Sequence, residues 1–188
     1  IPRERMENSW LTNFNQPQNR GYDGHLLTTI AEMRGQDPAD ALFDLMAEEN
    51  LGISMVGLGT NALTLPAFVS HRYGMIASDS ILFGEHPNPR SYGCFPLVLA
   101  EFVRAENHLR LPEAIRKMTS FPAQRLGLPD RGILKPGFKA DIVIFNPATV
   151  KTHATREDPK RYPVGIEYVI VNGTVVIDRG ENTGALPG

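Results

Sequence analysis

Asp79 is the residue of this sequence whose position best suits chemistry. It follows the apolar run of residues 73–78, which we interpret as a short buried strand that ends at the aspartate. In barrel enzymes the carboxyl ends of the strands carry the catalytic groups, and the loops that follow build the pocket. A partly desolvated carboxylate there suits transfer of a proton from a metal-bound water to a leaving amine. A helix cap or a hydrogen-bond acceptor in the loop is the alternative role for the same residue.

The turn-rich loop of residues 85–93 supplies the second group of candidates. The guanidinium of Arg90 can hold a substrate carboxylate through two parallel hydrogen bonds, or it can be a solvated loop charge. Ser91 follows it and is a further candidate for contact with a substrate. His86 can serve as a ligand or an acid, although a structural histidine is the commoner case. His71 suits the carboxyl end of a helix, where the dipole favours a cation.

The sequence lacks the spacings of a tight metal site. It contains no His-x-His, HExxH or CxxC motif. A zinc site takes at least three nitrogen, sulfur or oxygen ligands in a fixed arrangement, and Asp79 is the one convincing candidate here. The single cysteine, Cys94, has no evident base partner, so we do not expect a thiol nucleophile. The chain therefore offers at most one ligand to a metal ion.

The elements that must position these residues alternate between strand and helix. Residues 53–58 and 73–78 are typical of buried parallel strands, and a helix from residue 60 or 61 to about 71 joins them in a βαβ unit. Asn172 and Gly173 predict a type I′ turn between two later strands. The other predicted elements are a strand near 10–14, helices over 24–35, 37–50, 95–106 and 113–120, and strands over 141–145, 168–171 and 174–177.

Single residues fix some of these boundaries. Gly35 can end the first helix, and Asp37 followed by Pro38 suits the start of the second. Trp10 is the only tryptophan, and we expect it to be a packing anchor. After Gly127 the composition shifts, so we place a boundary near residue 130 between an α/β part and a β-rich part.

Composition narrows the class of protein. The 188 residues are too few for a complete eight-stranded α/β barrel, which needs about 250. A formal net charge of −2 argues against nucleic-acid partners and against a polybasic membrane surface. The sequence has no apolar run of about 18 residues that would predict a membrane helix, and its polar first residues include no secretory segment. The single cysteine excludes an internal disulfide and indicates a reducing, cytoplasmic setting. The sequence starts without Met, which indicates a processed or partial protein.

Two motifs, in this order, resemble one branch of a known superfamily. Residues 77–80 and 86–96, with the His-Pro-x-x-Arg-Ser-Tyr-Gly loop, resemble the D-aminoacylase (N-acyl-D-amino-acid deacylase) branch of the amidohydrolase superfamily. The Lys-Pro-Gly-x-x-Ala-Asp cassette within residues 134–143 is shared across that superfamily. Residues 114–123, 171–173 and 183–188 are also similar to this branch, so the resemblance covers roughly residues 20–188.

The resemblance implies an α/β fold in which this chain is the C-terminal part of a metal-dependent (β/α)8 barrel plus half of a small β-sandwich-like domain. Residues 1–130 would hold the last barrel strands with their following helices, and residues 131–188 the β-domain segment. Asp79 matches the aspartate that shuttles protons next to the metal and is a possible ligand. Arg90, with Ser91 beside it, matches the loop arginine associated with the α-carboxylate of the substrate.

The implied reaction is hydrolysis of the amide bond of a small N-acyl-D-amino acid, giving a carboxylate and a D-amino acid. The resemblance implies a zinc ion whose other ligands lie on earlier strands. The expected partner is therefore the N-terminal half of the same protein. Without that half, the chain by itself would be inactive. One alternative is a non-catalytic fragment or assembly module. Another is a cyclic amidohydrolase of the dihydroorotase or hydantoinase type, against which the loop after Asp79 argues. An Asp79 side chain turned toward bulk solvent would count against a hydrolase.

Overall fold

The computed structural model describes residues 6–57 and 63–188 and divides the chain into two compact units. The first unit takes its described residues from Ile1–Asn61, Asp79–Ser91 and Ala154–Lys160. The second takes them from Ala62–Ser78, Tyr92–His153 and Arg161–Gly188. No helix formed by the described residues is long and apolar enough to cross a membrane.

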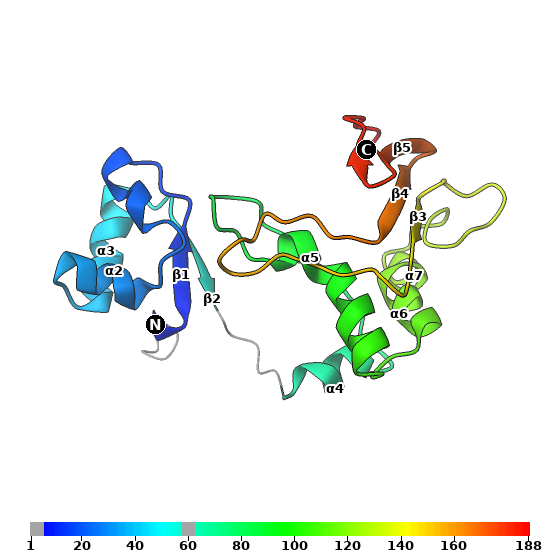
Figure 1. Cartoon of the computed structure of the whole chain (residues 1–188), viewed down its shortest axis with the longest axis horizontal. Helices are drawn as coiled ribbons and strands as arrows, with labels where there is room; N and C mark the ends of the chain where they lie inside the picture. The colour runs from blue at the N-terminus through cyan, green and yellow to red at the C-terminus, as the bar shows by residue number, and fades with distance from the viewer. Residues whose placement is uncertain (1–5, 58–62) are drawn as a thin grey trace. The chain divides into compact units, whose positions relative to one another are not determined.

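The first unit packs two helices against a two-stranded sheet (Figure 1). Strand β1 (Ser9–Thr12) pairs antiparallel with β2 (Ser54–Gly57), and a 3-10 helix η1 (Pro17–Tyr22) follows β1. Helices α2 (Leu27–Arg34) and α3 (Pro38–Glu48) complete the unit. The buried residues that form its core are Leu11, Phe14, Leu27, Ile30, Leu42 and Leu45.

Local signals set the ends of these helices as predicted. Gly35 ends α2 in the left-handed region at φ 65°, a conformation that glycine adopts without a Cβ penalty. Asp37 caps α3, because its side chain accepts a hydrogen bond from the backbone N–H of Ala39 at 2.9 Å, and Pro38 follows it. Trp10 is 1% exposed and is the packing anchor that the sequence indicates.

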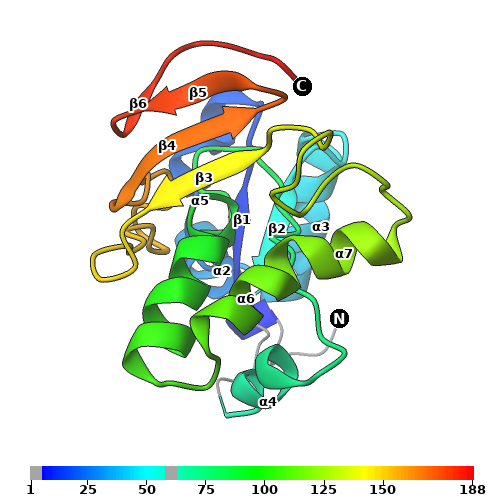
Figure 2. The same ribbon diagram turned by 90° about the vertical axis from the view of Figure 1, so that its right-hand side faces the viewer.

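The second unit combines short helices with a four-stranded antiparallel sheet, drawn in the order β3, β4, β5, β6 in Figure 2. Its core gathers buried side chains of the helices around Val150, with Phe145 and Ile166 of the sheet packed against them. The helices are α4 (Leu65–Ser70), α5 (Arg90–Leu97, whose first two residues belong to the first unit), the π-helix η2 (Val98–Ala105), α6 (Leu111–Met118) and α7 (Ser120–Arg125). The strands are β3 (Ile142–Phe145), β4 (Ile166–Val171), β5 (Thr174–Asp178) and β6 (Glu181–Asn182).

The β4–β5 hairpin is confirmed, including its turn. Asn172 and Gly173 have φ of 49° and 84°, and a type I′ turn requires positive φ at both central positions. Asp141 holds this turn beside β3, because its carboxylate accepts a hydrogen bond from the backbone N–H of Asn172 at 2.9 Å. Arg131 binds the same carboxylate and also donates to the side-chain oxygen of Asn172 at 2.7 Å.

The predicted βαβ unit is not present among the described residues. β2 lies antiparallel to β1 and alternates in exposure, so the expectation of a buried parallel strand over 53–58 was wrong. Residues 73–78 form no strand. A strand needs a neighbour for its backbone groups, and here the N–H of Ile76 instead donates to the carbonyl of Lys117 at 3.1 Å. The predicted start of the connecting helix, residue 60 or 61, lies outside the described residues.

The helix predicted over 95–106 exists in a modified form. It begins earlier, at Arg90, and changes from α to π geometry after Leu97. The chain is a mixed α/β fold, as expected. Its assignment to parts of a barrel and of a β-sandwich-like domain, with a boundary after residue 130, stays a prediction.

Candidate functional site

Asp79 lies in an irregular segment and not at a strand end. Its side chain is 82% exposed, so the expected partial desolvation was wrong for this chain. The reason is that residues 73–78 are not paired into a sheet among the described residues, so no strand delivers the aspartate to a protected edge. By the criterion stated above, the geometry of Asp79 taken by itself counts against a hydrolase.

Arg90 clamps Asp79 through three hydrogen bonds. Its Nη2 donates to the carboxylate oxygen Oδ2 at 2.6 Å and to the backbone carbonyl at 3.1 Å, and its Nε donates to the same carbonyl at 3.2 Å. The backbone of Asp79 is in the left-handed region at φ 47°, which is unusual for a residue other than glycine and is common at functional sites. A guanidinium has five N–H donors, so the two donors of Nη1 remain, and no described residue accepts a hydrogen bond from them.

Arg90 also lines a hollow of the first unit with a volume of about 270 Å³. This volume is close to the lower end of ordinary ligand pockets. The strands β1 and β2 form part of its wall, and the segment that leads to α5 forms the rest. The lining residues are Thr12, Ser54, Met55, Val56, Gly57, Ile81, Phe83, Pro87, Asn88 and Arg90.

The segment between Asp79 and Arg90 is closed by its own polar contacts. The side-chain oxygen of Asn88 accepts from the backbone N–H of Arg90 at 3.0 Å, which supports the first turn of α5. The hydroxyl of Ser91 donates to the carbonyl of Ile81 at 3.1 Å, and Ser80 donates to the carbonyl of Ser91 at 3.4 Å. The hydroxyl proton of Ser91 therefore serves the loop, and its contact with a substrate stays a prediction.

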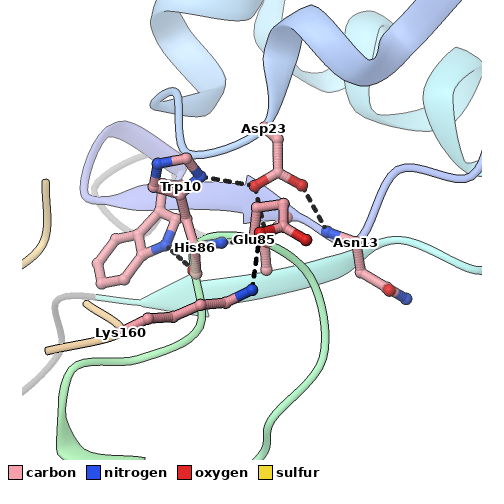
Figure 3. Close-up of polar contacts among 7 residues, drawn as sticks. Trp10, Asn13, Asp23, Glu85, His86 and Lys160 are labelled. Carbon is pink, nitrogen blue, oxygen red and sulfur yellow. Dashed lines mark hydrogen bonds and ion pairs between the residues drawn. The ribbon is translucent and has the colours of Figure 1, made fainter. Parts of the chain in front are cut away.

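His86, the other candidate of this loop, binds a residue that sequence reasoning missed. Its ring nitrogen Nδ1 lies 2.8 Å from Oδ1 of Asp23 (Figure 3). The two residues are 63 positions apart, so no spacing in the sequence links them. The side chain of Asp23 is 13% exposed, which makes it far better shielded from water than Asp79.

Lys117 is a buried cation that fixes the segment leading toward Asp79. It is fully buried, and its Nζ donates to the carbonyl of Gly74 at 2.8 Å and to the carbonyl of His71. Burial lowers the pKa of Lys117, because desolvation penalises the ammonium form. His71 follows the last residue of α4, where the sequence placed it.

The described residues do not fit a metal site by themselves. They contain no group of three or more His, Cys, Asp or Glu side chains close enough to hold a metal ion. The carboxylate of Asp79 has a cation, Arg90, as its near neighbour. A zinc ion needs at least three protein ligands, so any metal bound with the help of Asp79 takes its other ligands from elsewhere.

Comparison with known proteins shows which family the chain resembles. The model of the Amidohydrolase family matches residues 20–177. The N-acyl-D-aspartate deacylase of Alcaligenes xylosoxydans xylosoxydans is 45% identical over 116 residues, which are 62% of this chain and 23% of that protein. A crystal structure of D-aminoacylase superposes with a TM-score of 0.83 at 31% identity, covering 95% of this chain and 36% of the other.

A second solved relative carries a metal and an inhibitor. It is the N-acyl-D-glutamate deacylase of Bordetella bronchiseptica, complexed with zinc and a phosphonate that mimics the tetrahedral intermediate of the reaction. Its TM-score is 0.81 at 30% identity, over 92% of this chain and 35% of that one. The chain thus spans 23% of the curated relative and roughly a third of the solved ones. It belongs to the amidohydrolase family, and its resemblance to the D-aminoacylase branch is confirmed.

Proposed function

We propose that the enzyme to which this chain belongs hydrolyses the amide bond of N-acyl-D-amino acids with the help of a bound metal ion, zinc as in the Bordetella relative. The observation that carries the proposal is the superposition on D-aminoacylase over 95% of the chain. The related proteins named N-acyl-D-aspartate deacylase, N-acyl-D-glutamate deacylase and D-aminoacylase are 45%, 43% and 44% identical to this chain over the matched residues. The proposal therefore covers N-acyl-D-amino acids as a class and does not specify the side chain of the substrate.

Asp79 is the proposed proton carrier. An ionised carboxylate accepts the proton of the attacking water, and the resulting acid returns it to the nitrogen as the amide bond breaks. The side chain is 82% exposed in this chain, and the role requires that the proposed N-terminal half shield it from bulk solvent in the complete enzyme. Its backbone is left-handed, and Arg90 binds the backbone carbonyl. The remaining metal ligands would come from polypeptide outside the described residues.

Arg90 is the proposed ligand of the substrate carboxylate. Nε and Nη2 are occupied by Asp79, and the two donors of Nη1 are left for a carboxylate. Because Arg90 lines the hollow of about 270 Å³, a small anion there lies within reach of the guanidinium. Ser91 remains a second proposed contact.

We further propose that residues 1–130 belong to the barrel of the enzyme and residues 131–188 to its small β-domain. Exposed apolar side chains support a partner polypeptide that covers them, the N-terminal half of the same protein: Phe43 is 66% exposed, Phe68 72% and Leu134 76%. A reducing, cytoplasmic setting is proposed from the single cysteine.

The test uses the protein expressed from its complete gene. Wild type should release free D-amino acid from N-acetyl-D-amino acids, measured by chiral chromatography. Asp79→Asn should reduce turnover by at least about a hundredfold, in the range of a lost general acid–base, while metal content stays near that of wild type. Asp178→Asn, which alters an exposed carboxylate in β5, is the matched control and should keep full turnover.

Three results would contradict the proposal. Wild-type turnover in Asp79→Asn would remove the proton carrier from the mechanism. Hydrolysis of cyclic ureides in place of N-acyl-D-amino acids would move the enzyme to the dihydroorotase or hydantoinase type. A metal-free, inactive wild-type protein would support the alternative of a non-catalytic module.

A further inference from the structure

His86 supplies hydrogen bonds that tie the segment from Asp79 to Arg90 to β1, where Gly84 also packs closely against Thr12. His86 lies seven positions after Asp79 and four before Arg90. Its backbone N–H donates to Oγ1 of Thr12 at 3.1 Å, and its carbonyl accepts from the indole Nε1 of Trp10 at 2.9 Å. Figure 3 shows the contact between the carbonyl of His86 and Trp10 together with that between the imidazole and Asp23. Both backbone groups and the ring of one residue are therefore held.

Asp23 is built into this arrangement as an acceptor. Its Oδ1 accepts from the hydroxyl of Thr12 at 2.9 Å and lies 2.8 Å from the ring of His86, and its Oδ2 accepts from the backbone N–H of Asn13 at 3.0 Å. A carboxylate that is 13% exposed needs such partners, because an unpaired buried charge is strongly destabilising. We call Asp23, Thr12, Trp10 and His86 the clasp.

The clasp lies next to the part of the loop that lines the hollow beside Arg90. Thr12 lines the hollow from β1, and Pro87 and Asn88, the residues after His86, line it from the loop together with Arg90. Another link of the loop at this point is the ion pair between Glu85 and Lys160 at 2.7 Å. Its partners are 78% and 38% exposed, and exposed pairs contribute little. Loss of the clasp would thus remove the hydrogen bonds from the loop to β1 and leave the packing of Gly84 and the buried Pro87 to hold it.

We propose that Asp23 and His86 are positioning residues for the reaction: they hold the loop against β1 so that Arg90 presents its free donors to the substrate carboxylate. This inference rests on the proposed function, since it deepens the account of the same site. It assigns a role to Asp23, which touches neither Asp79 nor Arg90 in the hydrogen bonds of the described residues.

The experiment measures KM and kcat separately in the protein expressed from its complete gene. His86→Ala should raise KM for an N-acetyl-D-amino acid about tenfold or more, the loss expected when one hydrogen bond to a charged group no longer holds its partner, and kcat should fall by a smaller factor. His86→Asn should restore most of the affinity, because its amide nitrogen occupies a place similar to Nδ1 and can donate to Asp23. Asp23→Asn, which preserves shape, should resemble His86→Ala.

His108→Ala is the matched control. His108 also contacts a carboxylate, that of Glu106 at 3.1 Å, but the pair is exposed and belongs to the second unit. Its KM should equal that of wild type. An unchanged KM in both His86→Ala and Asp23→Asn, or no recovery in His86→Asn, would overturn the positioning role.

Hydrogen exchange separates this inference from the proposed function. Backbone amides of residues 80–91 should exchange at least about tenfold faster in His86→Ala than in wild type, whether or not the protein is active. Unchanged exchange would overturn the clasp even in an active enzyme. Faster exchange in a protein that does not hydrolyse N-acyl-D-amino acids would overturn the proposed function and leave the clasp as a purely structural device, which also refutes its positioning role.

Discussion

Replacing Gly24 by alanine perturbs the clasp without removing any of its polar atoms. Gly24 has φ of 80°, and a Cβ built on it would lie 2.6 Å from Cγ of the His86 ring. The imidazole would have to leave this place, and with it the contact to Asp23. Gly35 is the matched comparison, because it has φ of 65° in the same unit and a Cβ there would meet nothing within 4 Å.

The two substitutions share one energy term and differ in another. Both place alanine in the left-handed region, at a cost of about 1–2 kcal/mol. Gly24→Ala additionally loses the contact between His86 and the shielded Asp23, and a hydrogen bond to a charged group is worth about 1.5–3 kcal/mol. We therefore expect Gly24→Ala to lower the free energy of unfolding by about 2 kcal/mol more than Gly35→Ala does.

Urea unfolding followed by circular dichroism measures this difference. With a slope of about 2 kcal/mol per molar urea, the midpoint of Gly24→Ala should lie about 1 M below that of Gly35→Ala. In a protein that already carries His86→Ala, Gly24→Ala should cost no more than Gly35→Ala does, because the ring and its contact with Asp23 are already absent. Equal urea midpoints for the two glycine variants would refute the claim that the contact between His86 and Asp23 stabilises the fold.

Two further predictions concern the second unit. Lys117→Met should lower the free energy of unfolding by about 2 kcal/mol, because two carbonyls lose a charged donor; urea midpoints measure this, and an unchanged midpoint would contradict it. The pKa of Asp141 is lowered in the folded protein, first by the backbone N–H of Asn172 and then by Arg131. Its contribution is therefore present above the ordinary pKa of 3.8 and is lost as pH falls through the lower folded pKa. The melting temperature of Asp141→Asn, measured between about pH 2 and pH 6, should therefore fall less with falling pH than that of wild type. An equally steep fall in both proteins would contradict this.

Short-range chemistry made part of the fold predictable. Gly35, Asp37 and the Asn172–Gly173 pair each act within a few residues through backbone conformation or a local hydrogen bond. The helix ends and the hairpin appear where the sequence placed them.

The strand expected before Asp79 depends on what lies beside it. An apolar run of β-forming residues becomes a strand when a neighbouring strand satisfies its backbone groups. Residues 73–78 have no such neighbour among the described residues, and the carbonyl of Lys117 accepts the N–H of Ile76 instead. Sequence reasoning named Asp79, Arg90 and His86, but it missed Asp23, whose partner is 63 positions away.

The contact between Arg90 and Asp79 reconciles two roles that at first compete. If Arg90 only neutralised the carboxylate of Asp79, it would oppose proton transfer and would be unavailable to a substrate. Two of its three hydrogen bonds, however, go to the backbone carbonyl of Asp79, and these do not depend on the direction of the carboxylate. The ion pair itself is exposed, and exposed pairs contribute about 1 kcal/mol or less. Under the proposed mechanism the carboxylate can turn to a water or a metal ion at little cost, while the guanidinium keeps its contacts with the backbone carbonyl and its Nη1 donors stay available to a substrate.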